Sequence, residues 1–332
     1  MCRIQRERGH EPSVHCLLRV GVLGEELRAE GFDVRLHGPT HLPAATQRFH
    51  TLFKTARPDV VHCHNPTAAI YAAPAARIAG VPKVIATRHS LVAPPYNRLR
   101  EIKFSVAARF CDSVVGVCDA TVQNLSNAPL ACRRNLTRIY NGALPVRSCE
   151  STFLSKKGFT LVHVGRLAQI KNQHMLLDSF AIAKHALSDL SLWIVGDGVL
   201  RSELEHHANN LSLGDSVTFF GEQTDVSPFL SAADAFIMCS KSEGLPVSLL
   251  EAMSAGLPAI VTEVGGMAEI VSMSGAGVIA PTTGPGALAE AIVALAQDKK
   301  LLSQCGKAAR DSFERQFSIS AMLDQYMRLY CC

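Results

Sequence analysis

The chain has 332 residues, of which 48% are hydrophobic and 19% are charged. This composition predicts a globular protein with a large core, and at about 150 residues per domain the length predicts two domains. No apolar run reaches the roughly 18 to 20 residues that span a bilayer. The charged N-terminus has no apolar segment of the kind found in secretory signals, and eleven scattered cysteines include no Cys-x-x-Cys pair. We therefore expect a cytoplasmic protein with reduced thiols.

The formal net charge of +4 conceals an asymmetry between the two halves. Residues 1–150 contain 20 lysines and arginines against 11 acidic residues, whereas residues 151–332 contain 13 against 18. A basic first half favours an anionic partner, such as the inner face of the plasma membrane or a phosphorylated acceptor. Arginines dispersed over a solvated surface explain the charge equally well. Nucleic-acid binding is not expected, because the charges are not clustered and no recognition motif is present.

In the first half, strands and helices are predicted to alternate. The predicted strands are 12–18, 33–37, 60–64, 83–87 and 113–117, and the predicted helices are 1–9, 22–30, 42–56, 68–79 and 97–110. Such alternation predicts a parallel sheet covered by helices on both faces.

The front of this half departs from the expected pattern. A doubly wound domain normally opens with a strand and a glycine loop, but here Met1 falls inside the first predicted helix. We therefore expect a first domain that lacks its first strand. Either Met1 is not the true start, or the chain is a fragment or a degenerate copy. We favour an incomplete gene model or a fragment, because the remaining motifs are intact.

Two histidines mark the end of the third predicted strand. His62 and His64 alternate along the strand, so both point to the same face. The carboxyl end of a strand is where α/β proteins bind ligands, which suggests a polar ligand site. Hydrogen-bonded structural histidines are an equally good interpretation, and metal binding would need a third ligand that the sequence does not indicate.

A segment rich in proline, serine, lysine and glycine separates the halves at residues 143–158. We predict an N-terminal domain over 1–148, a linker and hinge over 149–158, a C-terminal domain over 159–318 and a terminal helix over 319–332. The second half has predicted strands at 160–164, 192–195, 217–221, 235–239 and 259–262, and predicted helices at 173–186, 200–209, 226–232, 290–296 and 303–317.

The first strand of the second half leads into a glycine turn with two cations. Gly165 and Arg166 follow the strand, and Lys171 precedes the next helix. A glycine turn, cations and a helix N-terminus together are a plausible cradle for phosphate. Gly196 opens a second glycine turn after the next strand, a weaker indication of the same kind.

The most informative stretch is 240–269, which is predicted as loop, short helix, turn, buried strand and glycine turn. Glu243 lies in the loop, Pro246 fits the first turn of the helix, and Glu251 lies about two turns inside it. The free N–H groups at the helix start favour an anion. Two carboxylates flanking that position could hold two polar parts of one ligand with a phosphate between them.

The motifs Ser-x-x-Glu-Gly-Leu-Pro, Glu-Ala-Met-x-Ala-Gly-x-Pro and Val-Gly-Gly-x-x-Glu in this stretch resemble the donor-site signature of the family 4 retaining glycosyltransferases. This resemblance implies the α/β GT-B fold, in which two Rossmann-like doubly wound domains face each other across a cleft. It also implies that the terminal helix crosses back to the first domain.

The resemblance also implies roles for individual residues. Glu243 would contact the donor sugar, Glu251 the ribose, and Arg166 and Lys171 the diphosphate. His89 matches the family's Thr-x-His, whose histidine lies near the reacting carbon, so the implied catalytic residues are His89, Glu243, Arg166 and Lys171. The implied donor-binding residues are Gly165, Arg166, Lys171, Gly196, Glu243, Gly244, Leu245, Pro246, Val247 and Glu251, and the acceptor-side candidates are His62, His64 and Asn141 of a Tyr-Asn-Gly turn.

The function implied is metal-independent, retaining transfer of a hexosyl-type sugar from a UDP- or GDP-sugar, with no cofactor. The acceptor would be a glycan or a lipid-linked molecule in surface polysaccharide or glycolipid synthesis. Two alternatives stay open, a non-catalytic nucleotide-sugar-binding remnant and a GT-B sugar-nucleotide epimerase. Loops of the first half, such as residues 89–98, are expected to select the sugar and the acceptor.

Overall fold

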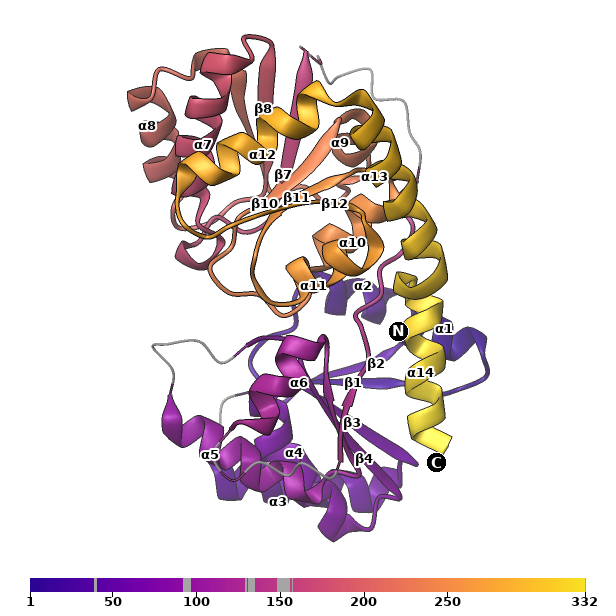
Figure 1. The fold of residues 1–332 in the computed structure, drawn as a ribbon. Helices are drawn as coiled ribbons and strands as arrows, with labels where there is room; N and C mark the ends of the chain where they lie inside the picture. Colours follow the sequence, from indigo (N-terminus) through magenta and orange to yellow (C-terminus); the bar gives the residue numbers. More distant parts are fainter. Residues whose placement is uncertain are drawn as a thin grey trace.

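The computed structural model describes residues 1–38, 41–91, 97–128, 130, 135–147, 156 and 158–331. Figure 1 shows two lobes, one formed by the first half of the chain and one by the second. The linker predicted at 149–158 lies outside the described residues, apart from residues 156 and 158.

The first half is built around a parallel sheet of four strands in the order β3-β4-β5-β6. The strands are β3 (Val60–His64), β4 (Lys83–Arg88), β5 (Ser113–Gly116) and β6 (Leu136–Arg138). The helices that connect them are α4 (Asn65–Ala79), α5 (Arg98–Ala107) and α6 (Asp119–Ser126), with α3 (Leu42–Ala56) packed against α4. Small residues along α4, five alanines of which are buried, allow that helix to approach its neighbours closely.

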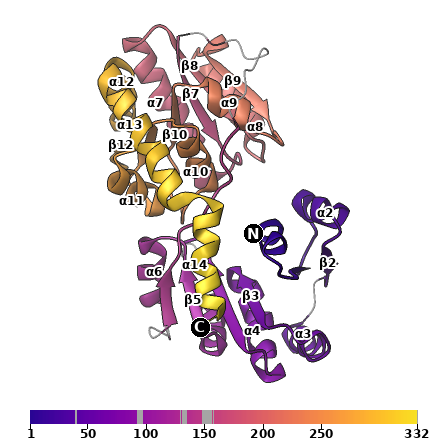
Figure 2. The same ribbon diagram turned by 90° about the vertical axis from the view of Figure 1, so that its right-hand side faces the viewer.

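A second, two-stranded sheet forms the front of this half. It pairs β1 (Ser13–Cys16) with β2 (Asp33–Leu36) in parallel, and α1 (Cys2–Glu7) and α2 (Val22–Ala29) accompany it. Figure 2 shows this group to one side of β3. No described strand joins β1 to β3, so the first half is not one continuous sheet.

The second half contains a parallel sheet of six strands in the order β12-β11-β10-β7-β8-β9. The strands are β7 (Phe159–Val164), β8 (Leu190–Val195), β9 (Val217–Gly221), β10 (Ala235–Met238), β11 (Ala259–Thr262) and β12 (Gly277–Ala280). The helices are α7 (Gln173–Ala186), α8 (Arg201–Asn210), α9 (Ser227–Ala232), α10 (Val247–Ser254), α11 (Gly265–Ser274), α12 (Pro285–Gln297) and α13 (Lys299–Ser312).

Both faces of this sheet are buried, as continuous apolar strands predict. Along β10, Phe236 and Met238 join one hydrophobic cluster, while Ala235 and Ile237 join another. The strand therefore contributes alternate residues to two cores, one on each face of the sheet. Packing on both faces therefore fixes the positions of the strands and of the loops that follow their carboxyl ends.

The chain ends by packing against the first half. A π-helical turn (Phe313–Phe317) follows α13 and leads into α14 (Ile319–Cys331), which runs along the lobe of the first half in Figure 1. Met322 and Tyr326 of α14 share a hydrophobic cluster with Ile85, Val115 and Ile139.

Several predicted elements differ from those observed. The glycine turn expected after β11 is the start of α11, and the sequence analysis missed β12, α6 and β6. The helix predicted at 303–317 begins instead at Lys299, because Asp298 accepts hydrogen bonds from the amides of Lys300 and Leu301. Glu251 lies only about one turn inside α10, because that helix begins at Val247.

Candidate active site

The three predicted site histidines, His62, His64 and His89, lie together at the carboxyl ends of β3 and β4. Nδ1 of His64 lies 3.0 Å from Nε2 of His89, and the rings of His62 and His64 are 4.1 Å apart between centroids. Adjacent parallel strands place these side chains together, because His64 pairs with Thr87 in the register of the sheet. Burial lowers the pKa of His89, so its imidazole is neutral near pH 7.

His62 is held by side chains that are remote in sequence. Its Nδ1 lies 2.8 Å from the Tyr330 hydroxyl and its Nε2 lies 2.7 Å from Oγ1 of Thr87. The Tyr326 hydroxyl lies 3.0 Å from the same Thr87 oxygen. Both ring nitrogens of His62 are thus occupied by neighbouring side chains, and α14 supplies two of the three hydroxyl groups in this network.

His89 also lies against the glycine of the 240–269 motif. A Cβ atom on Gly244 would stand 2.2 Å from the His89 carbonyl oxygen, so the two backbones touch. Asn141 hydrogen-bonds the His89 side chain, and its Nδ2 donates to the Leu245 carbonyl at 2.8 Å. The predicted catalytic histidine and the predicted donor motif therefore meet where the two halves are in contact.

The glycine turns after β7 and β8 pack directly on each other. The Gly165 amide donates to the Val195 carbonyl at 3.0 Å, and a Cβ atom on Gly196 would stand 2.2 Å from the Gly165 carbonyl oxygen. Gly196 also has a backbone φ angle of +135°, which residues other than glycine rarely adopt. The Gly196 position therefore requires glycine, whereas a Cβ atom on Gly165 would meet only ordinary contacts, and the Arg166 side chain is exposed at this turn.

A buried hydrogen-bond network, which was not predicted from the sequence, holds the turn at Gly165 and Arg166 in place. Gln173 Nε2 donates to the Arg166 carbonyl at 3.0 Å and lies 3.3 Å from His163 Nε2. His163 Nδ1 lies 3.0 Å from the Ile237 carbonyl, which requires the proton on Nδ1 and leaves Nε2 as an acceptor for Gln173. Burial lowers the pKa of His163 to about 4, so this neutral tautomer persists near pH 7.

Lys171 and Glu243 form the central ion pair of the predicted donor site. Lys171 Nζ lies 2.5 Å from Glu243 Oε1, and both side chains are less than one-fifth exposed. Lys171 lies in a 3-10 turn before α7, whereas Glu243 lies in the loop between β10 and α10. The sheet order places β7 next to β10, which explains why these residues meet despite their separation of 72 positions.

The start of α10 presents backbone amides beside this pair. Pro246 precedes the helix with extended backbone angles, Leu245 is buried and Val247 is exposed. The first N–H groups of the helix have no intrahelical partners and favour a negative group. Burial, together with the charge of Asp225, raises the pKa of Glu251.

The 240–269 stretch contributes one further residue, Glu269, for which the sequence predicted no role. Glu269, on α11, accepts hydrogen bonds from the Asp119 amide at 2.9 Å and from the Tyr140 hydroxyl at 2.7 Å. In the sequence, the one indication of a role for Glu269 is its place as the last residue of the Val-Gly-Gly-x-x-Glu motif. The sequence does not show which residues Glu269 contacts.

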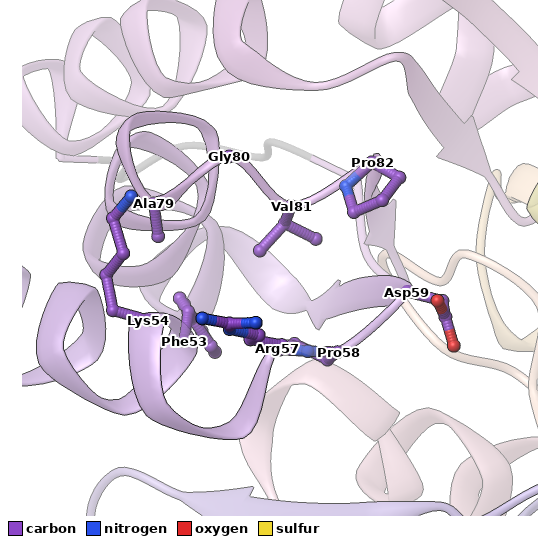
Figure 3. Close-up of a pocket in the computed structure, with 9 residues that line it drawn as sticks. All are labelled: Phe53, Lys54, Arg57, Pro58, Asp59, Ala79, Gly80, Val81 and Pro82. Atoms are coloured by element: carbon purple, nitrogen blue, oxygen red, sulfur yellow. The ribbon is translucent and has the colours of Figure 1, made fainter.

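The hollow in Figure 3 is separate from this site. It is lined by residues around the amino ends of β3 and β4, among them Arg57, Asp59 and Pro82. Ligands of parallel α/β sheets bind at the opposite, carboxyl edge. Of the loop expected at 89–98, residues 92–96 lie outside the described part of the chain.

Within the described ranges, no group of three or more histidine, cysteine, aspartate or glutamate side chains is placed to hold a metal ion. Among the described helices, none combines the length and the apolarity needed to cross a membrane.

Comparison with known families matches both halves. Residues 1–144 match Glycosyltransferase Family 4, and residues 149–312 match Glycosyl transferases group 1. The chain belongs to the group 1, family 4 glycosyltransferases. The first family match ends at residue 144 and the second begins at residue 149. The linker predicted for this glycosyltransferase also begins at residue 149.

Individual relatives of this glycosyltransferase are distant. A UDP-Gal:alpha-D-GlcNAc-diphosphoundecaprenol alpha-1,3-galactosyltransferase of Escherichia coli is 26% identical over 300 residues, covering 84% of this chain and 76% of that protein. The N-acetyl-alpha-D-glucosaminyl L-malate synthase of Bacillus anthracis is 29% identical over 177 residues, covering 53% of this chain but only 46% of its own length. This chain therefore spans about half the length of the Bacillus anthracis relative.

Solved structures confirm the GT-B fold. HepE of Anabaena, in complex with UDP-glucose, superimposes with a TM-score of 0.84 at 19% identity, covering 98% of this chain and 94% of that one. Sucrose-phosphate synthase of Thermosynechococcus elongatus superimposes with a TM-score of 0.77 at 19% identity, covering 96% and 98%. At these identities the likeness establishes the fold alone.

Proposed function

We propose that this chain transfers a hexosyl-type sugar from a nucleotide sugar, UDP-linked in preference to GDP-linked, to a glycan or lipid-linked acceptor. The observation that carries the proposal is the meeting of Lys171 and Glu243 beside the backbone contact of His89 with Gly244. Phosphate-binding, sugar-binding and catalytic candidates thus lie within one small region. The E. coli relative, whose name specifies a UDP-sugar donor and a diphosphoundecaprenol-linked acceptor, supports the substrate classes.

The Lys171–Glu243 pair suggests where the scissile bond would lie. Lys171 would contact the diphosphate and Glu243 the sugar, and the bond between those two parts of the donor is the one that breaks. Their side chains are in direct contact at 2.5 Å, so groups bound to each would be neighbours. Fixed charge of this kind, directed at the position where charge develops, is usually the largest catalytic contribution.

The leaving diphosphate would be stabilised by groups of the second half alone. Arg166 is exposed at the Gly165 turn, and α10 begins four residues after Glu243, the partner of Lys171. Together with Lys171, Arg166 and the amides at the start of α10 supply the positive charge that a divalent ion supplies in other transferases. We therefore propose a reaction that needs no metal.

His89 would act from the first half as a neutral hydrogen-bonding group. Its lowered pKa favours the uncharged ring, and the His64 and Asn141 side chains fix the orientation of that ring. A neutral imidazole does not repel the positive charge that develops at the reacting carbon. We propose retention of anomeric configuration, with the acceptor attacking from the face that the diphosphate leaves.

The lipid-linked acceptor class suggests peripheral contact with an anionic membrane. On α5 of the basic first half, the exposed side chains include Arg98, Arg100 and Lys103 together with Leu99, which is 59% exposed. Cations beside an exposed apolar residue favour an anionic lipid surface. Contact of this kind would place the protein at the inner face of the plasma membrane.

Incubation of the protein with UDP- and GDP-sugars and a diphosphoundecaprenol-linked acceptor, in the presence of EDTA, tests this function. We expect sugar transfer from one UDP-sugar, with retained configuration in the product by NMR. Lys171→Ala should lower the affinity for that donor about tenfold or more, since hydrogen bonds to charged groups contribute about 1.5–3 kcal/mol. The control Lys307→Ala changes an exposed lysine of α13 and should bind normally. Absence of transfer with every donor, or full dependence on a divalent metal, would contradict the proposal.

A further inference from the structure

Glu269 lies on one half of the molecule and makes its contacts with the other. Its carboxylate accepts hydrogen bonds from the amides of Asp119, at 2.9 and 3.1 Å, and of Ala120, at 3.4 Å. These are amides of the first turn of α6, which have no partners inside the helix. A carboxylate at this end of a helix is also favoured by the helix dipole.

Two side chains of the first half complete the environment of this carboxylate. The Tyr140 hydroxyl donates to Glu269 Oε1 at 2.7 Å and accepts from Arg138 Nη1 at 2.8 Å. The Arg138 guanidinium also lies 3.9 Å from Glu269 Oε1. The Glu269 side chain is only 18% exposed, so solvent screens these interactions incompletely.

Both ends of this contact lead directly to the candidate active site. On the side of the second half, α11 begins at Gly265, and the Gly266 amide donates to the Gly244 carbonyl at 2.7 Å. On the side of the first half, α6 follows β5, and β5 pairs with β4 so that Gly116 faces Arg88, the residue before His89. The Glu269 contact therefore joins the element that carries Gly244 to the element that neighbours His89.

We propose that Glu269 is a positioning residue for sugar transfer, which fixes the approach of His89 to the donor motif by capping α6 across the boundary between the halves. The inference rests on the proposed function. Glu269 touches neither substrate nor the reacting atoms, and it acts through the relative placement of α11 and α6. Its loss would leave the donor-binding groups of the second half in place, while His89 would no longer be held beside them.

The test compares Glu269→Ala in the full chain with a matched control, Asp298→Ala. Asp298 also caps a helix, accepting from the Lys300 and Leu301 amides, but the cap lies wholly inside the second half. We expect Glu269→Ala to lower kcat roughly 10- to 100-fold, which at 1.36 kcal/mol per factor of ten is about 1.4–2.7 kcal/mol in the activation barrier. Its affinity for UDP should stay within about threefold of wild type, as should kcat and UDP affinity in Asp298→Ala.

Two further variants distinguish positioning from general damage. Glu269→Gln keeps an oxygen acceptor for the α6 amides and should recover part of the lost kcat. Tyr140→Phe removes one of the contacts, so its effect should be smaller and should not add to that of Glu269→Ala in a double-mutant cycle. A wild-type kcat in Glu269→Ala, additivity in the cycle, or a parallel loss of UDP affinity would overturn the proposal.

Small-angle X-ray scattering tests the contact without any transfer assay. With the contact removed, Glu269→Ala should have a larger radius of gyration than wild type and Asp298→Ala in saturating UDP. An unchanged radius of gyration would overturn the positioning role. Failure of wild-type protein to transfer any sugar would instead overturn the proposed function and leave the scattering result to decide the contact.

Discussion

At the scale of single residues, the site is defined by charges and imidazoles whose ionisation is set by burial. Glu251 is an example, because burial and the neighbouring Asp225 raise the pKa of its carboxyl group. A carboxyl with a raised pKa takes up its proton at a higher pH than usual and then loses its charge. The proposed donor site therefore contains a carboxyl group that becomes protonated at a higher pH than an ordinary glutamate does.

We predict that the affinity for UDP-glucose falls as the pH is lowered through the raised pKa of Glu251, because only the ionised carboxylate accepts hydrogen bonds strongly from ribose hydroxyls. Glu251→Gln should bind more weakly at neutral pH and should lose most of this pH dependence. Isothermal calorimetry at several pH values measures both effects. An unchanged pH dependence in Glu251→Gln would contradict the assigned role.

The candidate site residues that the sequence indicates lie close together in the chain. Glu243 and Glu251 lie in one loop and helix, and Gly165, Arg166 and Lys171 lie in one turn, so a short pattern identifies each group. The partners of His62 could not be predicted in this way. Tyr330 is 268 positions away, and only the packing of α14 on the first half brings it to the histidine.

At the scale of elements, the loop before α10 is in close backbone contact with the residue that follows β4. Gly244→Ala would place a methyl group 2.2 Å from the His89 carbonyl oxygen, so the two elements would have to separate. We predict at least a tenfold loss of kcat/KM, because a misplacement of about 1 Å can cost about 100-fold. Steady-state kinetics measures the loss.

Gly286→Ala provides a matched control for this substitution. An added Cβ atom at Gly286, in the first turn of α12, meets nothing within 4 Å. This variant should keep full activity and gain roughly 0.5–1 kcal/mol of stability, as alanine does over glycine in helices. Equal activity in the two variants would show that the contact between Gly244 and His89 does not matter.

The elements missed by the sequence analysis share a physical cause. Strand β12 has four residues, β6 has three and α6 has eight, so each is too short to repeat an apolar pattern clearly. The glycine pair that opens α11 has the composition of a turn. In the structure this pair begins the helix, and the Gly266 amide donates to the Gly244 carbonyl.

At the scale of the whole molecule, buried neutral histidines couple stability to pH. Burial lowers the pKa of His163 to about 4, below its ordinary value of 6.5. Between these two values the unfolded chain binds more protons than the folded protein, so the free energy of unfolding falls as the pH is lowered from about 6.5 to about 4. The contribution of His163 is roughly 3 kcal/mol across this window.

Urea denaturation at pH 7 and pH 4.5 measures this effect. We predict that His163→Gln shows a smaller loss of stability between the two pH values than wild type does, while the exposed His10→Gln behaves as wild type. Identical pH dependence in His163→Gln and wild type would contradict the prediction.

The overall architecture was largely predictable, because strands and helices alternate regularly and both halves carry family motifs. The division of the first half into two sheets was less predictable, because strands that pair can lie far apart in the sequence. The contact of Glu269 with α6 was not predictable either. It joins residues 150 positions apart in sequence, on opposite halves of the molecule.

The central claim is that the two halves form one site, in which the second half holds the donor and His89 from the first half serves the reaction. Donor binding and sugar transfer measured side by side in His89→Ala test it most directly. We predict UDP affinity close to that of wild type, with transfer reduced about 100-fold or more, within the range of positioned catalytic groups. Wild-type transfer in His89→Ala would contradict the account.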